Sequence, residues 1–354
     1  MKRDSILKAI QQNRTVANQD LTGIDLAGAD LTGGRFEKVS FRGANFSGAN
    51  ILRTGFKKCA FPGARFDGTD LTKVDLRKMD LSGASLRGVK LHMTLLSNAN
   101  MEQADFSGAD LGWSLMQHAR LAGANFSQAC LEKMILSHAD LAGADFTGAN
   151  LTKVIFHEAT LPGAIFQKSR LFKVLLAGCG LAGQDFRGTS FQQVNVTGSN
   201  LQGADFTGVD IGYSNFMEAD LTGARLDRTH GPNAMFKGAR LRQATLTQAN
   251  LAQAYFGEAV LAAADLSGAN LDHVFFTRAD CRAARFAGSC LAYAEFAQAD
   301  LTGADFTGAD LTWTRFHLVL DDHAIWDRTD RSTVRGTDPD LAEAEIWPRK
   351  GSDQ

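Results

Sequence analysis

Residues 139–158 read ADLAGADFTGANLTKVIFHE, four successive pentapeptides that share one plan. Every fifth residue is large and apolar, and the residue two places before it is small. The position between them is usually Asp or Asn, and Thr or Ser followed by Gly often completes the unit. A period of five fits neither the helical period of about 3.6 nor the strand period of about 2. The chain must therefore turn a corner in each pentapeptide.

The same register extends outward from this stretch, from Leu21 to Phe316, over about sixty successive pentapeptides. The large residue is missing once, at Gly231 within Asp227–Met235, and Phe236 resumes the register. A second period of twenty accompanies the first, because Phe concentrates in two of four columns and Leu in the other two. Four pentapeptides therefore form one coil, with phenylalanine and leucine side chains stacked along its interior.

These residues resemble the A-(D/N)-L-x-x motif of the pentapeptide-repeat family, of which ADFTG at 144–148 and ADLTG at 299–303 are near-ideal copies. The resemblance covers about five-sixths of the chain. It implies an all-β fold, a right-handed quadrilateral β-helix of about fifteen coils with short helical caps at both ends. We expect a helical cap at 1–18, the β-helix at 19–318, and a C-terminal cap or dimerisation segment with a disordered tail at 319–354.

The predicted caps would cover the terminal coils and prevent end-to-end association. Asp4 and Ser5 fit the N-cap of a short helix, whose apolar residues are Ile6, Leu7 and Ile10. Asp338 followed by Pro339 fits the start of a second helix, whose apolar residues are Leu341, Ile346 and Trp347. Arg349–Gln354 is predicted to be disordered.

Bulk properties narrow the function classes. The formal net charge is −2, which gives no general attraction to nucleic acid or to anionic membranes, and no apolar run is long enough to span a bilayer. The N-terminal MKRDSILKAIQQN lacks the apolar core of a secretory signal, and five cysteines without close spacing favour reduced thiols. We expect a cytoplasmic bacterial protein with no membrane partner and no direct nucleic-acid binding.

One face departs from the repeat pattern. The faces that begin at Leu21 and Leu26 keep Gly in the last repeat position, whereas the face that begins at Phe36 does not. Its outward position is aliphatic in five consecutive coils and aromatic further along, at Leu95, Leu115, Ile135, Ile155, Leu175, Tyr255 and Phe275. The corner before it carries bulky or basic residues, among them Met93, Trp113, Lys133, Lys153, Lys173, Tyr213, His273, Tyr293 and Trp313. Towards the N-terminus the same region is basic, with Arg35, Lys38, Arg53, Lys57, Lys58, Lys73, Arg77 and Lys78.

Two explanations of the aliphatic residues remain open. A contiguous exposed apolar patch is typical of a binding surface. Alternatively, Leu and β-branched side chains at this position improve the packing of the wall itself. The sites predicted for protein binding are therefore Leu95, Leu115, Ile135, Ile155, Leu175, Trp113, Lys133, Lys153, Lys173, Tyr255 and Phe275.

No pattern indicates a catalytic centre, a metal site or a cofactor. His118 and His138 should lie on adjacent coils with His157 nearby, but no third ligand of matched geometry is evident. The acidic cluster after the last repeat matches no calcium loop; it comprises Asp321, Asp322, His323 and Asp327. Cys130 and Cys290 occupy outward positions, and nothing in their surroundings marks an activated thiol. We therefore expect no enzymatic activity.

The predicted function is a non-enzymatic scaffold or adaptor that binds a protein through the apolar and basic face. A short helix running into DLTGIDLAGADL at 20–31 resembles pentapeptide-repeat proteins associated with bacterial type VI secretion, which implies an accessory or effector-related role. The alternative from the family is a DNA mimic that binds and protects DNA gyrase. Arginines interrupt the acidic columns and disfavour mimicry; they are Arg65, Arg120, Arg225, Arg240 and Arg285. A homodimer through the C-terminal segment or the apolar face is the other expected partnership.

Overall fold

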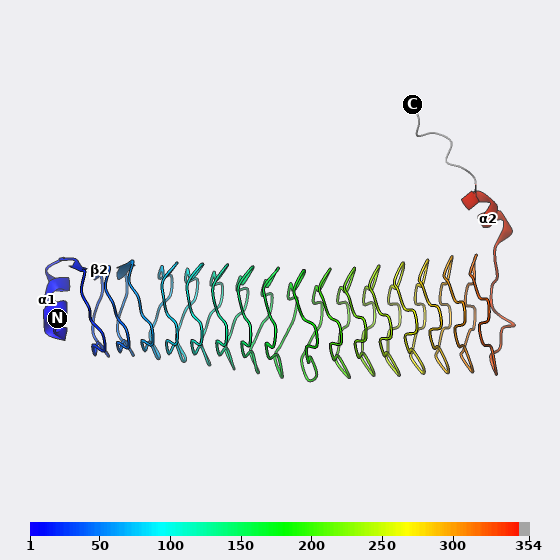
Figure 1. The fold of residues 1–354 in the computed structure, drawn as a ribbon, viewed down its shortest axis with the longest axis horizontal. Helices are drawn as coiled ribbons and strands as arrows, with labels where there is room; N and C mark the ends of the chain where they lie inside the picture. Colours follow the sequence, from blue (N-terminus) through cyan, green and yellow to red (C-terminus); the bar gives the residue numbers. More distant parts are fainter. Residues whose placement is uncertain (347–354) are drawn as a thin grey trace, which may run out of the picture. The chain divides into compact units, whose positions relative to one another are not determined.

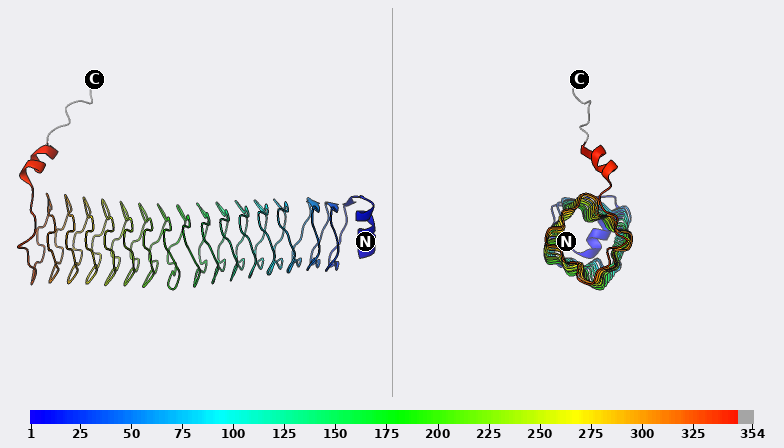
Figure 2. Two further views of the ribbon diagram at one scale, coloured as in Figure 1. Left: turned by 180° about the vertical axis from the view of Figure 1, so that it is seen from behind. Right: turned by 90° about the vertical axis from the view of Figure 1, so that its right-hand side faces the viewer.

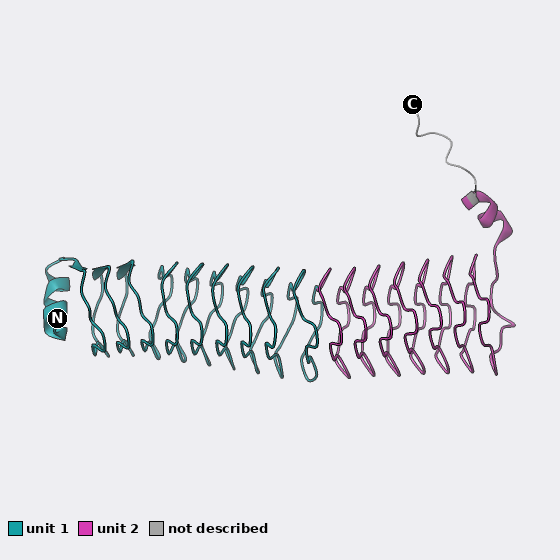
Figure 3. Cartoon of the chain, in the orientation of Figure 1, with its two compact units in different colours: residues 1–195 teal, residues 196–354 magenta. Residues whose placement is uncertain are grey.

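The computed structural model describes residues 1–346 of the chain. These residues fall into two compact units, Met1–Asn195 and the described part of Val196–Gln354, shown in Figure 3. The regular elements labelled in the structure are α1 (Arg3–Gln11), β1 (Val16–Ala17), β2 (Arg35–Glu37), β3 (Gly55–Lys57) and α2 (Pro339–Ile346), with α2 in the second unit (Figure 1). The expected apolar contact of Trp347 and the expected disorder of Arg349–Gln354 lie outside the described residues.

Each unit is a β-helix whose coils repeat every twenty residues. In the first unit β1, β2 and β3 form a parallel sheet in which Val16 pairs with Phe36, and Phe36 with Phe56. Parallel bridges continue the same spacing, for example Leu115 with Ile135, and in the second unit Asn250 with Asn270. The all-β fold predicted from the five- and twenty-residue periods is therefore confirmed for each unit.

The inward columns fill the interior of the coils. Phe106, Phe126 and Phe146 are fully buried, and their rings stack with centroids 4.9 and 5.1 Å apart. In the second unit the rings of Phe236 and Phe256 stack in the same way, 4.6 Å apart. Stacked rings add to the roughly 1.5–3 kcal/mol that burial of each large apolar side chain contributes. The period of twenty in the sequence thus arises because residues twenty apart lie directly over one another on adjacent coils.

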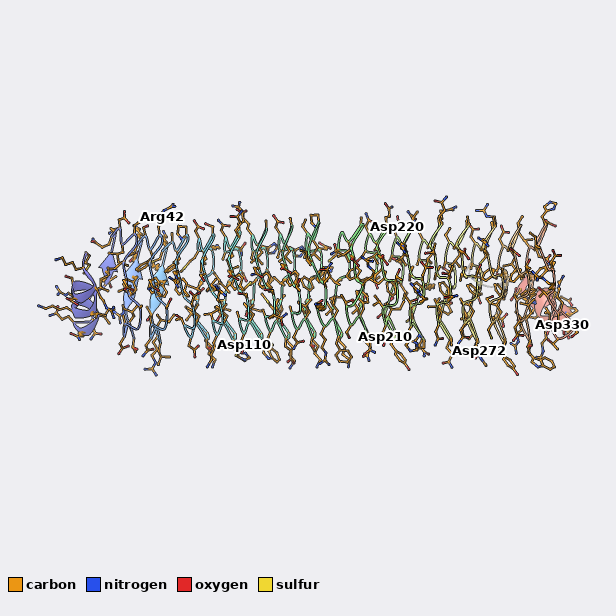
Figure 4. The ribbon with its side chains drawn as sticks, turned by 90° about the horizontal axis from the view of Figure 1, so that it is seen from below. Arg42, Asp110, Asp210, Asp220, Asp272 and Asp330 are labelled. Atoms are coloured by element: carbon orange, nitrogen blue, oxygen red, sulfur yellow. The ribbon has the colours of Figure 1, made fainter. Side chains whose placement is uncertain are left out.

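The outward Asp and Asn residues form the turns. Oδ1 of Asp145 accepts the backbone N–H of Thr147 at 2.8 Å, and Oδ1 of Asp305 accepts that of Thr307 at 2.9 Å. An acceptor two residues before a backbone N–H is the geometry of an Asx-turn, which explains why Asp and Asn dominate this position. Figure 4 shows two such residues on the outside of the coils, Asp110 in the first unit and Asp210 in the second.

Neighbouring coils compensate for the one missing inward residue. A Cβ atom added to Gly231 would lie 2.7 Å from Cγ1 of Ile211 and 3.0 Å from Cδ2 of Leu251. The two flanking side chains therefore occupy the space that a larger residue would need. Phe236 is again fully buried, so the register is kept, as predicted.

The N-terminal helix α1 covers the first coils (Figure 2). Ile6 is fully buried, and Cδ1 of Ile10 lies 3.1 Å from the place that a Cβ atom on Gly34 would take, so α1 packs closely on this coil. The guanidinium of Arg3 also donates a hydrogen bond to the carbonyl of Ala27 at 3.0 Å. The predicted N-cap was wrong: α1 begins at Arg3, with Lys2 at its N-cap, and Asp4 lies in its first turn.

The coils of the second unit extend past the boundary expected at residue 318. Bridges join Asp300 to Leu320, Asp305 to Ile325, and Arg315 to Arg335. Trp326 takes the inward position and stacks on Phe306 with ring centroids 4.6 Å apart, and the guanidinium of Arg331 lies 4.2 Å from the Trp326 ring centroid. An indole and a guanidinium therefore close this part of the interior.

The second helix, α2, begins where the sequence predicts. Oδ1 of Asp338 accepts the backbone N–H groups of Asp340 and Leu341 at 3.0 and 3.2 Å, which caps the helix. Nε2 of His317 lies 3.6 Å from a carboxylate oxygen of Glu345. Leu341 is 48% exposed, so this apolar residue does not fill the core contact expected of a cap.

Candidate partner-binding face

The predicted face lies between two corners that carry side chains. At the other two corners glycines such as Gly143 and Gly148 supply the left-handed turn, with φ of 66° and 67°. At the corners of the predicted face, Trp113 and His138 adopt the same conformation, with φ of 61° and 58°. The first corner column comprises Arg53, Lys73, Met93, Trp113, Lys133, Lys153 and Lys173, and the second comprises Lys38, Lys58, Lys78, Asn98, His118, His138 and Glu158.

This conformation costs an L-residue with a side chain roughly 1–2 kcal/mol. Glycine adopts it without that steric penalty and is the usual solution at the other corners of the same coils. From Lys38 to Lys173 both corner columns hold a side chain at every position, with Gly33 and Gly178 at their ends, whereas the other two corners of these coils hold side chains only at Gln103, Gln128 and Lys168. Strain concentrated on two corners out of four indicates that the side chains there have a use other than stability.

The structure brings the five aliphatic residues together. Leu95, Leu115, Ile135, Ile155 and Leu175 bridge one another in order, one per coil. Each of the five is half-buried, because its neighbours along the column cover part of it. We name these five residues the aliphatic column. Their partial burial is compatible with wall packing as well as with binding, so the column alone does not decide between the two explanations.

The aliphatic column also lacks the Asx-turn hydrogen bond that Asp or Asn makes at the outward position. Elsewhere in the same outward column, Oδ1 of Asp75 accepts the N–H of Arg77 at 3.1 Å, and Oδ1 of Asn215 accepts that of Met217 at 2.9 Å. Leu and Ile cannot accept it. A net hydrogen bond contributes about 0.5–1.5 kcal/mol, less where water competes for the donor. The aliphatic column therefore lacks a stabilising contact that Asp or Asn would provide.

The first corner column adds exposed apolar and basic groups beside the aliphatic column. Trp113 is 48% exposed, and Nζ of Lys133 lies 4.3 Å from its ring centroid, within cation–π range. Met93 is exposed, as are Lys153 and Lys173, whereas Lys133 is half-buried. The predicted site residues of the first unit therefore form one surface, with an apolar middle and a basic edge.

The predicted site residues of the second unit form a separate aromatic group. The rings of Tyr255 and Phe275 have centroids 6.1 Å apart; Phe275 is exposed and Tyr255 half-buried. In the corner column beside them, the imidazole of His273 stacks on Tyr293 at 4.8 Å. The other exposed large residues of this region are Tyr213, Met235 and Trp313. The corresponding repeat positions are thus aliphatic and basic in the first unit and aromatic in the second.

A hollow that the sequence did not reveal lies on the predicted face of the first unit. It measures about 940 Å³ and includes Gly55, which leaves an outward position empty between Arg35 on one coil and Asp75 on another. Phe56 and Met79 contribute apolar surface, and Lys57, Lys58, Arg77 and Lys78 are basic residues of its lining. A glycine at an outward position, where the template has Asp or Asn, was the available sequence signal.

The structure brings together the histidines that the sequence placed on adjacent coils. The imidazoles of His118 and His138 stack with centroids 4.9 Å apart, and His157 lies edge-on to His138. Glu158 contacts two of them, at 3.3 Å from Nδ1 of His138 and 3.5 Å from Nε2 of His157. Across residues 1–346 no group of three or more His, Cys, Asp or Glu side chains is arranged to hold a metal ion.

The titratable groups of the coils show structural causes for their shifts. Hydrogen bonds from the hydroxyl and the backbone N–H of Thr72 hold the pKa of Asp70 below its ordinary value of 3.8, and Thr307 does the same to the pKa of Asp305. Burial raises the pKa of the Cys179 thiol to about 12 and also raises the pKa of Cys281. Carboxylates held ionised by turns, and thiols kept protonated, are poorly suited to acid–base or nucleophilic catalysis.

The fold and this face define a repeat solenoid with a packed interior and a differentiated surface. A model of the family described as "Pentapeptide repeats" matches the chain in segments that run from residues 20–51 to residues 279–317. The chain belongs to the pentapeptide-repeat family, whose fold is a right-handed β-helix. Among the described residues, no helix is both long enough and apolar enough to cross a membrane.

Solved structures with weak overall similarity include two of this family. The plasmid-mediated fluoroquinolone resistance protein QnrB1 is 22% identical, with 56% of this chain and 90% of that chain covered, at a TM-score of 0.43. HetL, a pentapeptide repeat protein involved in heterocyst differentiation regulation in the cyanobacterium Nostoc sp., is 24% identical, with 70% and 89% covered, at a TM-score of 0.19. No curated protein sequence matches the chain.

Proposed function

We propose that the chain is a non-enzymatic protein-binding scaffold or adaptor of the bacterial cytoplasm, and that it binds its partner through the face between the two side-chain corners. The observation that carries the proposal is the left-handed conformation of residues such as Trp113 and Lys133, where glycine would be less strained. Within the first unit the face repeats on every coil from Arg53 to Lys173, which provides several adjacent coils for such contacts.

Three properties of the face support binding over wall packing. The strained corner residues are exposed, as Met93 and Trp113 show, so their side chains do little for the packing of the wall. The aliphatic column omits the turn hydrogen bonds that Asp75 and Asn215 make in the same outward column. Apolar groups beside exposed lysines, such as Lys153, form the mixture of apolar centre and charged rim that protein interfaces use.

The chemistry of the face indicates the partner. An apolar ridge bordered by carboxylates would fit the aliphatic column and the lysines of the first corner column. The resemblance to modules associated with type VI secretion supplies a setting, in which the partner is a component or an effector of that apparatus.

The test replaces three central residues of the aliphatic column, each of which has an aliphatic residue on both adjacent coils. The triple variant Leu115→Asn, Ile135→Asn and Ile155→Asn introduces a residue that can make the Asx-turn found at Asn215. The tagged full chain is used to isolate partners from the native cell, and the identified partner is then titrated in purified form. We expect affinity to fall by at least 100-fold, because each lost aliphatic contact is worth roughly 1.5–3 kcal/mol.

The control variant carries Arg120→Asn, Asp140→Asn and Thr160→Asn, at outward positions of the same coils on a neighbouring face. It is expected to keep both stability and affinity. If the aliphatic variant melts well below the parent and still binds with parental affinity, the column serves the wall and the proposal is wrong.

A further inference from the structure

The hollow at β2 and β3 carries an excess of positive charge. Two of its cations are neutralised, because Lys57 pairs with Glu37 at 3.0 Å, and Arg77 pairs with Asp75 through hydrogen bonds of 2.9 and 2.7 Å. Other basic groups have no carboxylate within 4.0 Å among residues 1–346; in and beside the hollow they are Arg35, Lys38, Lys58 and Lys78. We name this hollow the basic groove.

The groove suits a short acidic segment. The carboxylates of Glu37 and Asp75 are already paired with Lys57 and Arg77, so Arg35, Lys58 and Lys78 leave the lining with a net positive charge. Phe56 and Met79, each only 7% exposed, form part of the apolar floor that a leucine side chain could contact. Lys38, Lys58 and Lys78 lie one coil apart in a single corner column, a spacing of about 4.8 Å.

The helix α2 has the complementary composition and lacks a sufficient packing surface. Its segment carries four carboxylates and no basic residue from Asp338 to Ile346; they are Asp338, Asp340, Glu343 and Glu345. Leu341 is 48% exposed, and Glu343 and Ala344 are also exposed. Isolated helices shorter than about 12–15 residues are marginal in water, so this eight-residue helix needs a second surface to be stable.

We propose that α2 of one copy of this chain docks into the basic groove of a second copy, so that copies associate head to tail. A helix of eight residues is about 12 Å long, close to the span of about 10 Å from Lys38 to Lys78. Carboxylates one helical turn apart, about 5.4 Å, face lysines one coil apart. Leu341 covers the apolar lining.

Such an interface is heterologous, because it joins two different surfaces. It therefore produces open chains or closed rings instead of stopping at a symmetric dimer. Its ion pairs are exposed at the rim, so salt weakens it: the screening length falls from about 10 Å at 0.1 M to about 3 Å at 1 M. The expected signature is a mass that rises with protein concentration at low salt and returns to the monomer at high salt.

The first experiment measures the mass of the full chain by sedimentation over a range of concentrations. The groove variant is Lys58→Glu with Lys78→Glu; Glu158 occupies the same corner column with φ of 54°, so the fold accepts glutamate there. The control variant has the same change of charge outside the groove, Lys90→Glu with Lys168→Glu. We expect association at least ten-fold weaker in the groove variant and unchanged in the control variant.

The second experiment uses a fluorescent peptide of residues 336–346 and the full chain. The peptide is expected to bind the parent chain, to lose at least ten-fold in affinity for the groove variant, and to regain it when the peptide carries Asp340→Lys and Glu343→Lys. The proposal is overturned if the chain is monomeric at every concentration, if both lysine variants weaken association equally, or if a single-stranded oligonucleotide occupies the groove and the peptide does not. The triple Asn variant of the aliphatic column should associate as the parent does, which separates this proposal from the function proposed above.

Discussion

Two pairs of corners in the same coils are built from different kinds of residue. At one pair the chain turns on glycines such as Gly143 and Gly163, whose left-handed φ values are free of side-chain strain. At the other pair it turns on residues such as Trp113 and Lys153, with φ of 61° and 59°. The interior beside both pairs is equally packed, since Leu111 and Leu141 are both fully buried. The difference therefore lies in what the corners present to the outside.

The comparison teaches how to separate structure from function in a repeat fold. The fold places the same requirements on every coil, for inward apolar residues, small neighbours and Asx-turns, so residues that meet those requirements carry no information about a partner. Residues that depart from these requirements, at a cost in stability, do carry information about a partner. This reasoning is why we propose the side-chain corners and the aliphatic column as the partner-binding surface, with the glycine corners as scaffold.

The largest effect is expected inside the coils, where both pairs of corners depend on one core. Phe126→Ala removes a ring stacked between Phe106 and Phe146, and should lower the free energy of unfolding by about 3–5 kcal/mol. Leu115→Asn, on the half-buried outer column, should change it by less than about 1 kcal/mol. Chemical denaturation of both variants measures the two values. Equal losses would show that the outer column is part of the core.

A smaller effect is expected from acid. Turn hydrogen bonds hold the pKa of Asp70, Asp305 and similar carboxylates below 3.8 in the folded chain. A lowered folded pKa stabilises the fold above the unfolded pKa, and this contribution is lost as the pH falls through the folded value. The melting temperature should therefore be constant from about pH 6 to about pH 4 and fall below that. A decline that begins near pH 6 would contradict this assignment to the carboxylates.

No effect is expected on DNA gyrase. If the protein protected gyrase by mimicking DNA, its functional surface would be the acidic faces. The contrast between the two pairs of corners would then carry no functional meaning. On the face with glycine corners, arginines neutralise these columns: Arg225 lies 3.9 Å from Asp205, and Arg285 lies 3.4 Å from Asp265. A supercoiling assay with and without a fluoroquinolone should show neither inhibition nor protection. Protection at sub-micromolar protein would assign the function to the acidic faces.

The sequence alone was enough for the coil and for the place of the distinctive face, because a period of five with a superposed period of twenty fixes which residues share a column. The sequence was insufficient where the structure depends on residues that do not follow the pentapeptide pattern. The start of α1 was predicted too late, since Lys2 caps the helix without a side-chain hydrogen bond and no pattern marks it. The extra coil after Phe316 was missed because Trp326 closes the core with residues that do not match the motif.

The basic groove shows the same limit. The basic residues around Lys58 were visible in the sequence, but the hollow depends on the empty outward position of Gly55 and on which cations are paired. Ion pairing depends on side-chain rotamers and on distances between adjacent coils. The assignment of residues to columns from the sequence gives neither. Periodicity therefore places residues on a face, and only the structure shows which of them remain available.

The exchange of corner types tests the central claim most directly. One variant carries Trp113→Gly, Lys133→Gly and Lys153→Gly; its reciprocal carries Gly143→Lys and Gly163→Lys, where an added Cβ meets nothing within 4 Å. Relief of about 1–2 kcal/mol of strain per residue outweighs or matches the roughly 0.5–1 kcal/mol entropic cost of glycine. The account predicts that the first variant melts at or above the parental temperature and loses its partner, while the reciprocal melts lower and keeps it. A first variant that melts well below the parent and binds its partner with full affinity would contradict the account.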